Sequence, residues 1–360
     1  MSGTTPVQQG NTPSAANPVG LDGIDFVEFA SSEPEKLRQL FLEFGFSRTH
    51  RHQRKKIDLY QQNDITFMIN MEPESFAWHF SKAHGPSACS MGWRTRNAKD
   101  AVGTAVKRGA KAAETCDLVS DAGAPVPAIY GIGDSLIYFI DQFRDPNRYL
   151  RLGFEPHPAP DKTVEKGFQY VDHLTNNVYK GTMQTWANFY KEVFGFTEVR
   201  YFDIRGQKTG LQSYALRSPC TKFCIPINEA TEKKSQINEY LDEYKGPGIQ
   251  HIAFMTDNIL DSLDRMKGTS VQMLDIDEDY YQEVFKRVPN VTEDHKKIEA
   301  HNVLVDGDEN GYLLQIFTKN IIGPIFIEII QRHNNNTFGE GNFGALFRAI
   351  ERDQVKRGVL

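Results

Sequence analysis

The sequence predicts an α+β fold of two domains, each built from two similar modules in which a strand leads into a helix and then into further strands. Two internal resemblances carry this prediction. Residues 23–29 (GIDFVEF) resemble residues 167–173 (GFQYVDH), and both alternate apolar and polar side chains as a half-buried strand does. Residues 84–93 (HGPSACSMGW) resemble residues 245–254 (KGPGIQHIAF), so the unit recurs inside each half.

The first strand of each half is followed by a helix. Apolar residues recur there at helical spacing, and Gly45 and Gly195 stand where helix C-caps fall. These apolar residues are Leu37, Leu40, Phe41 and Phe44 in the first half and Trp186, Phe189, Tyr190, Val193 and Phe194 in the second. Further helices are expected over residues 98–108 and 259–266, and further strands over residues 57–60, 65–70, 210–216 and 222–227. The halves also end alike, in residues 136–143 (LIYFIDQF) and 325–332 (IFIEIIQR).

The 360 residues are expected to divide into four parts. Residues 1–18, rich in Gly, Ser, Thr, Pro and Asn, predict a disordered tail rather than a signal peptide. Residues 19–150 are the expected first domain, and residues 151–166, with three prolines, the expected linker. Residues 167–360 are the expected second domain, which ends in a helix over residues 344–356.

The bulk composition excludes several classes of protein. With 39% hydrophobic and 24% charged residues, the chain is typical of a globular protein, and no stretch approaches the ~18 apolar residues of a membrane span. The net charge of −6 argues against nucleic acid as a partner. The four cysteines lack zinc-site spacing and are expected to be reduced thiols. Because no export signal is recognised, a cytoplasmic location is expected.

Three residues of the second half have metal-binding side chains at regular spacing. His173, His251 and Glu328 are 78 and 77 positions apart, as expected if each comes from a matching strand of a repeated unit. Two imidazoles and one carboxylate on one face of an ion, with open positions opposite, are typical of iron(II) sites that activate O2. Glu328 also lies within an apolar run, where an unpaired carboxylate would cost several kcal/mol.

The pattern alone leaves alternatives open. A single histidine on an apolar strand is more often a hydrogen-bonded core residue, and zinc, manganese or nickel could take the place of iron. The first half serves as an internal control, because aligning the copies places Phe29, Ser90 and Phe139 at the matching positions. One half therefore has three ligand-type residues and the other has none.

Several long segments closely resemble the signature blocks of the 4-hydroxyphenylpyruvate dioxygenase family. These segments are residues 171–179 (VDHLTNNVY), 248–254 (GIQHIAF), 313–318 (LLQIFT), 326–332 (FIEIIQR) and 338–343 (FGEGNF). The resemblance runs from about Gly20 to the C-terminus, and residues 350–360 are similar to the end of the bacterial members. Ala230 and Thr337 depart from the Pro and Gly that are frequent at these positions.

The resemblance implies the vicinal oxygen chelate fold, in which paired βαβββ modules form open barrels. The N-terminal domain would be structural, and the C-terminal domain would hold one iron(II) per subunit through His173, His251 and Glu328. The implied reaction converts 4-hydroxyphenylpyruvate and O2 to homogentisate and CO2 by decarboxylation, ring hydroxylation and side-chain migration, in tyrosine and phenylalanine catabolism. Because the 2-oxo acid supplies electrons by decarboxylation, no 2-oxoglutarate, NAD or flavin is expected.

The resemblance also implies a substrate pocket and a gate. The residues expected to pack the aromatic ring are Phe317, Phe338 and Phe343, and those expected to supply hydrogen bonds are Ser213, Asn228, Gln236, Gln250 and Gln315. Without the resemblance, the phenylalanines would be interpreted as ordinary core and Gln236 as part of a solvated helix face. The terminal helix resembles the family's gate, with glycine hinges at Gly339, Gly341 and Gly344.

Two rival functions are distinguishable. 4-Hydroxymandelate synthase shares the substrate, iron and fold but hydroxylates the side chain, and Phe317 favours the ring-hydroxylating reaction. A metal-free binding module is the alternative from another class, and the intact set of three ligand-type residues argues against it. The family resemblance also suggests a homo-oligomer, either a dimer or a tetramer.

Overall fold

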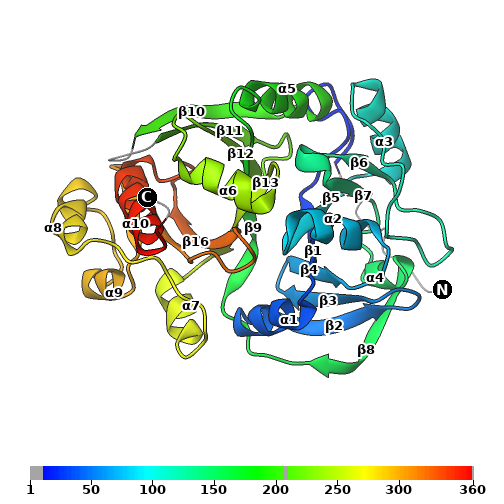
Figure 1. Cartoon of the computed structure of the whole chain (residues 1–360), viewed down its shortest axis with the longest axis horizontal. Coiled ribbons are helices and arrows are strands. Elements are labelled where there is room, and N and C mark those ends of the chain that lie inside the picture. The colour runs from blue at the N-terminus through cyan, green and yellow to red at the C-terminus, as the bar shows by residue number, and fades with distance from the viewer. Residues whose placement is uncertain (1–10, 206–209, 359–360) are drawn as a thin grey trace, which may run out of the picture.

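The computed structural model describes residues 11–205 and 210–358, which form two similar halves side by side (Figure 1). Each half contains one eight-stranded sheet. In Figure 1 the colour of the N-terminal half runs from blue through cyan to the green of β8, and that of the C-terminal half from green to red. The predicted α+β architecture is confirmed.

The first sheet has the strand order β6-β7-β5-β1-β4-β3-β2-β8. Its strands are β1 (Ile24–Ala30), β2 (Ser47–His52), β3 (Ile57–Gln62), β4 (Ile65–Asn70), β5 (Ser87–Arg94), β6 (Ala128–Tyr130), β7 (Leu136–Ile140) and β8 (Phe154–Asp161). The helices of this half are α1 (Pro34–Glu43), α2 (Phe76–His84), α3 (Ala98–Lys107), α4 (Arg148–Arg151) and the 3-10 helix η1 (Ile132–Asp134).

The second sheet has the order β10-β11-β12-β9-β13-β16-β15-β14. Its strands are β9 (Phe168–Asn177), β10 (Thr197–Arg205), β11 (Gly210–Arg217), β12 (Cys224–Ala230), β13 (Gly248–Thr256), β14 (Leu304–Asp308), β15 (Gly311–Phe317) and β16 (Phe326–His333). The helices are α5 (Met183–Phe194), α6 (Gln236–Tyr244), α7 (Ile259–Met266), α8 (Glu278–Arg287), α9 (His295–Ala300), the 3-10 helix η2 (Glu340–Asn342) and α10 (Phe343–Lys356). No helix of the described residues is long and apolar enough to cross a membrane.

The pairing of the central strands shows the predicted repeat. The first strands of the two modules, β1 and β5 in one sheet and β9 and β13 in the other, lie antiparallel to each other. The last strand of each module lies parallel to its first strand, as β16 does to β13 and β7 to β5. The expected helix stop at Gly195 is also present, because this residue caps α5 in the left-handed conformation with φ 80°.

An aromatic core joins the two halves. Phe44 and Phe46, which follow α1, lie with their ring centroids 5.9 and 5.8 Å from that of Phe254 on β13. Phe168 of β9 packs on the same ring at 5.3 Å. Such edge and tilted contacts between buried rings stabilise the interface beyond the area that they bury.

Two parts of the expected domain layout differ from the structure. The expected linker, residues 151–166, contains β8, which pairs with β2 at the edge of the first sheet. An edge strand tolerates proline where the missing N–H would face solvent. Of the expected disordered tail, residues 11–18 are described and ordered: the Asn17 side chain is buried and donates to the carbonyl of Leu21. Residues 1–10 lie outside the described part of the chain, and the domain boundaries themselves stay a prediction.

A β-bulge on β9 places the first of the three ligand-type residues. Neighbouring residues Ala253 and Phe254 of β13 pair with His173 and Val171, which leaves Asp172 as an extra residue of β9. A bulge of this kind re-aims the side chains beside it.

The same bulge recurs in the first sheet. Gly92 and Trp93 of β5 pair with Phe26 and Ile24 of β1, which leaves Asp25 as the extra residue. The structural counterpart of His173 is therefore Phe26, three residues before the one predicted from the aligned copies.

The register of the other strands completes this comparison. On β13 the extra residue Gln250 precedes His251, as Cys89 precedes Ser90 on β5. Glu328 lies opposite Ala253, as Tyr138 lies opposite Gly92. The counterparts of His173, His251 and Glu328 are thus Phe26, Ser90 and Tyr138.

Two of the predicted internal controls therefore have to be corrected. Phe29 packs against Phe41 of α1, with ring centroids 5.2 Å apart, and Phe139 packs against Phe194 of α5 at 6.4 Å. Both face the helices rather than the interior of the first barrel. The prediction for Ser90 agrees with the register.

Candidate active site

Three side chains of the second sheet converge on one point. Nε2 of His173 lies 3.0 Å from Oε2 of Glu328, and Nε2 of His251 lies 3.3 Å from each of these two atoms. Ligand atoms at right angles around one ion, each about 2.1 Å from it, are about 3 Å apart. The triangle therefore fits one face of an octahedral metal site in both donor type and spacing.

The two bulge residues orient the histidines. Oδ2 of Asp172 lies 2.7 Å from Nδ1 of His173, and Oε1 of Gln250 lies 3.0 Å from Nδ1 of His251. When each Nδ1–H donates to its neighbour, Nε2 carries the lone pair that a metal needs. The backbone irregularity that places Asp172 and Gln250 beside the histidines therefore also selects their tautomer.

The electrostatics of this point favour positive charge. Burial alone would raise the pKa of Glu328, but the charge of His173 and the hydrogen bonds from both histidines hold it at about 2. Burial alone would lower the pKa of His173, but Glu328 and Asp172 raise it to about 9. Burial lowers the pKa of His251. The carboxylate is thus ionised, and its charge would be balanced either by a proton on His173 or by a cation among the three atoms, which would take the place of that proton.

An aromatic cavity opens beside the three ligand atoms. It contains seven of the eight predicted substrate residues, namely Ser213, Asn228, Gln236, Gln250, Phe317, Phe338 and Phe343. The ring of Phe338 lies 5.5 Å from that of His173, and the ring of Phe317 lies 6.3 Å from that of His251. An apolar pocket with a few convergent polar groups is the usual form of a small-molecule site.

Comparisons with known proteins agree with this geometry. The model for the N-terminal domain of hydroxyphenylpyruvate dioxygenases matches residues 15–155, and the model for the glyoxalase, bleomycin resistance protein and dioxygenase superfamily matches residues 170–315. Protein MelA of Shewanella colwelliana is 59% identical over 96% of this chain and 99% of its own. The 4-hydroxyphenylpyruvate dioxygenase of Pseudomonas aeruginosa is 44% identical over 96% of this chain and 97% of its own.

The chain belongs to the 4-hydroxyphenylpyruvate dioxygenase family. A solved mutant of 4-hydroxymandelate synthase from Streptomyces coelicolor, 22% identical, has the same fold with a TM-score of 0.80 over 93% of this chain and 99% of that one. The predicted vicinal oxygen chelate architecture of this family is confirmed.

One predicted residue of this 4-hydroxyphenylpyruvate dioxygenase family member is not part of the cavity lining. Gln315 is buried on β15, and among the described residues neither of its amide atoms has a hydrogen-bond partner. Its amide lies directly against Gly339, where an added Cβ would come within 2.3 Å of Nε2. The Gln315 amide therefore packs against the residue that follows Phe338, with both of its polar atoms available for a hydrogen bond.

The sequence prediction missed nine lining residues. They are Thr175, Phe202, Ile204, Leu211, Pro226, Phe326, Leu346, Phe347 and Ile350. Thr175 and Phe326 lie two positions from His173 and Glu328 along their strands, so the two-residue period of a strand could have found them.

Helix α10 covers the cavity with one apolar face. Leu346, Phe347 and Ile350 follow Phe343 at helical spacing, and all four line the cavity. Polar contacts hold the opposite side of the helix: Arg352 pairs with Asp277 at 2.6 Å, and further along the helix Gln354 donates to Glu239 at 2.8 Å. The terminal helix therefore forms part of the cavity wall, and its role as a gate stays a prediction.

Proposed function

We propose that this protein is an iron(II)-dependent 4-hydroxyphenylpyruvate dioxygenase that converts 4-hydroxyphenylpyruvate and O2 to homogentisate and CO2. The observation that carries the proposal is the convergence of His173, His251 and Glu328, whose ligand atoms all lie within 4.8 Å of one another at the wall of an aromatic cavity. The 44% identity to the Pseudomonas aeruginosa enzyme supports the choice of substrate and reaction.

The donor set fits iron(II), and the family relationship favours iron over its rivals. Two imidazoles and one carboxylate on one face, with the other face open to the cavity, are typical of non-haem iron(II) oxygenases. Catalytic zinc sites can have the same three ligands, so the choice of iron rests on the similarity to 4-hydroxyphenylpyruvate dioxygenases. When bound, iron(II) supplies the one-electron chemistry that lets O2 react with an organic molecule. His173, His251 and Glu328 would hold it, and Asp172 and Gln250 would keep the imidazoles in register.

The cavity residues would bind and orient the substrate. Phe317 and Phe338 lie next to the histidines and would confine the aromatic ring, while Ser213, Asn228 and Gln236, which also line the cavity, would offer hydrogen bonds. Helix α10 excludes water from the reacting groups, which favours positioned chemistry over loss of reactive species to solvent. Because decarboxylation of the 2-oxo acid supplies two electrons, the residues present need no site for 2-oxoglutarate, NAD or flavin.

Product analysis tests the proposal directly. The purified protein reconstituted with iron(II) is mixed with 4-hydroxyphenylpyruvate while O2 uptake is followed, and the products are separated and identified by mass. We expect equal consumption of O2 and substrate, with homogentisate as the product. Accumulation of 4-hydroxymandelate would instead assign the side-chain reaction. Binding of the substrate with no O2 uptake would favour the metal-free binding module.

Compartment and assembly follow from the same proposal. A catabolic enzyme with reduced cysteines fits the cytoplasm, and the described cysteines are all unpaired thiols. A homo-oligomer, dimer or tetramer, stays a prediction for sedimentation or light scattering to measure.

A further inference from the structure

Behind His173 lies a buried ion pair between Asp172 and Arg332. Nε and Nη2 of the guanidinium donate to the two carboxylate oxygens at 2.9 and 2.8 Å, and the two side chains are only 12% and 11% exposed. Oδ2 of Asp172 also accepts from Nδ1 of His173. The planar guanidinium of Arg332 therefore holds the carboxylate of Asp172 in place, and this carboxylate in turn orients the imidazole of His173.

The other side of the same guanidinium holds a loop. Nη1 of Arg332 donates to the carbonyls of Asn335 and Thr337 at 3.2 and 2.6 Å. The loop is closed on itself, because the amide and the hydroxyl of Thr337 both donate to Oδ1 of Asn335 at 2.9 and 2.6 Å. The next residue is Phe338, whose ring lies 5.9 Å from the guanidinium and 5.5 Å from the ring of His173.

We propose that Arg332 is a positioning residue that couples the orientation of His173 to the loop of residues 333–338 and, through it, to the pocket wall at Phe338. This inference rests on the proposed metal site. Four N–H groups of one rigid fork contact both structures, so a shift of Asp172 cannot leave the loop unchanged. Metal binding, by fixing His173, orders the loop, and an ordered loop in turn presents His173 correctly.

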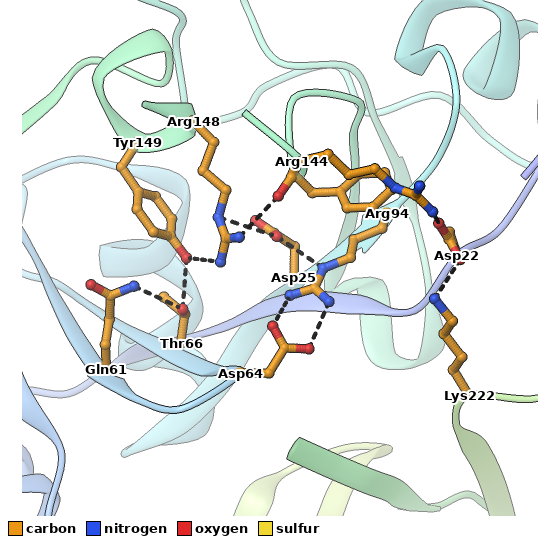
Figure 2. Close-up of polar contacts among 11 residues, drawn as sticks. Asp22, Asp25, Gln61, Asp64, Thr66, Arg94, Arg144, Arg148, Tyr149 and Lys222 are labelled. Carbon is orange, nitrogen blue, oxygen red and sulfur yellow. Dashed lines mark hydrogen bonds and ion pairs between the residues drawn. The ribbon is translucent and has the colours of Figure 1, made fainter. Parts of the chain in front are cut away.

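The first barrel contains the same bulge without this coupling. Asp25 is fully buried between Arg94 and Arg148, and Arg94 uses the rest of its fork on Asp64 (Figure 2). The next residue is Phe26, which offers no ligand atom. An aspartate–arginine pair at this bulge can therefore serve the sheet alone, and Arg94 is the matched control for Arg332.

The test uses cobalt(II) as the probe, on the full-length protein stripped of metal with a chelator. Two properties are measured for the wild type, Arg332→Lys and Arg94→Lys. The first is cobalt affinity by competition with a chelator, together with the cobalt absorption spectrum. The second is amide hydrogen exchange of residues 333–338 with and without cobalt.

For the wild type we expect cobalt to slow exchange in the loop by at least about ten-fold. Arg332→Lys keeps the charge but loses the fork, so cobalt affinity should fall by about 10–100-fold and the loop should no longer respond to the metal. Arg94→Lys should lower thermal stability while its cobalt affinity, cobalt spectrum and loop response stay as in the wild type. If Arg332→Lys does not fold, Asp172→Asn, which keeps an acceptor for His173, should show the same losses to a smaller extent.

The outcomes separate this inference from the function on which it rests. A wild type that binds no cobalt overturns both. A wild type that binds cobalt, with Arg332→Lys or Asp172→Asn equal to it in affinity and loop protection, overturns the coupling and leaves the metal site standing. Equal losses in Arg332→Lys and Arg94→Lys would show a general effect on folding and would also overturn the coupling.

Discussion

The two barrels of this protein share the order of seven strands, β6 to β2 in the first sheet and β15 to β10 in the second, and they share two bulges. They differ in what occupies the point where the central strands meet. In the second barrel this point holds two imidazoles and a carboxylate beside an open cavity. In the first it holds the rings of Phe26 and Tyr138, with centroids 6.0 Å apart. Gly92 makes room for Phe26, because an added Cβ would come within 2.3 Å of that ring. The same backbone therefore supports either a reactive site or a packed core, and the interior side chains decide which.

A second contrast concerns how the barrels treat buried polar groups. In the first barrel Glu28 accepts hydrogen bonds from Asn70 at 2.7 Å and from Ser90, and Asn70 also reaches Asp117 at 3.0 Å. These side chains therefore use one another as hydrogen-bond partners. In the second barrel Thr175, Asn228 and His251 line the cavity instead. Polar groups that pair with one another inside a barrel stabilise it, whereas polar groups that line a cavity can also contact a ligand.

The largest effect is expected when the carboxylate of Glu328 is replaced by an amide, because only the second barrel would then lose its function. Glu328→Gln keeps the volume but removes the anionic ligand, so we expect turnover to fall at least about 1000-fold and iron affinity to fall with it. Turnover of 4-hydroxyphenylpyruvate and iron retention after gel filtration are the measurements.

The control is Tyr138→Phe at the counterpart position in the first barrel. The Tyr138 hydroxyl accepts the amide of Asp117 at 2.9 Å, so its loss leaves a buried N–H unpaired and should lower the free energy of unfolding by about 1–3 kcal/mol. Turnover should remain close to that of the wild type. Near-normal turnover in Glu328→Gln would contradict the metal site, and lost turnover in a folded Tyr138→Phe would contradict the division of labour.

Much of this contrast could be predicted from the sequence, because side-chain chemistry is visible there. His173, His251 and Glu328 are metal-binding residue types at regular spacing. The counterparts of His173 and Glu328 in the first barrel could not be predicted, because they depend on how the strands pair. Nothing in the sequence around Asp25 and Asp172 indicates that these two residues form bulges. Alignment on the glycine that begins each copy therefore selected Phe29, which faces α1.

The misplaced linker has a different physical cause. Three prolines in residues 154–161 remove N–H donors and indicate an unpaired segment. β8 nevertheless pairs with β2 because an edge strand needs donors on one side only. Tertiary pairing of this kind depends on residues more than 100 positions away, which local patterns do not contain.

Removing the carboxyl group of Glu28, which is buried in the first barrel, should change how the free energy of unfolding depends on pH. Burial and the neighbouring Asp117 raise the pKa of Glu28 to about 7, from an ordinary value of 4.5, against the opposing effects of Ser90, Asn70 and Lys55. Between these two values the folded protein binds the proton more tightly than the unfolded chain does. The free energy of unfolding of the wild type should therefore fall as pH rises from about 4.5 to 7.

Glu28→Gln should abolish that fall, with little difference from the wild type at pH 4.5 and a gain of up to about 3 kcal/mol at pH 8. Urea unfolding across this pH range is the measurement, and turnover at pH 8 should be preserved. The exposed Glu309→Gln is the control and should leave the profile unchanged. A parallel profile for Glu28→Gln and the wild type would show that folding does not raise the pKa of Glu28.

The barrels also differ by a single methyl group, at the position opposite Phe26 in the first sheet and opposite His173 in the second. Gly92 and Ala253 occupy equivalent positions, opposite Phe26 and His173 respectively. Gly92→Ala forces Phe26 out of its place and should cost about 1–3 kcal/mol of stability, since overpacking a close-packed core strains side chains. Ala253→Gly should cost about 1 kcal/mol through backbone entropy and leave turnover within a few-fold of the wild type.

Chemical unfolding and steady-state turnover measure both effects, and Phe26→Leu added to Gly92→Ala should restore part of the stability by making room for the methyl group. A Gly92→Ala protein as stable as the wild type would mean that the first barrel is not packed around Phe26. The second barrel tolerates a methyl group at this position because a histidine, an ion site and a cavity, rather than a close-packed ring, lie above it.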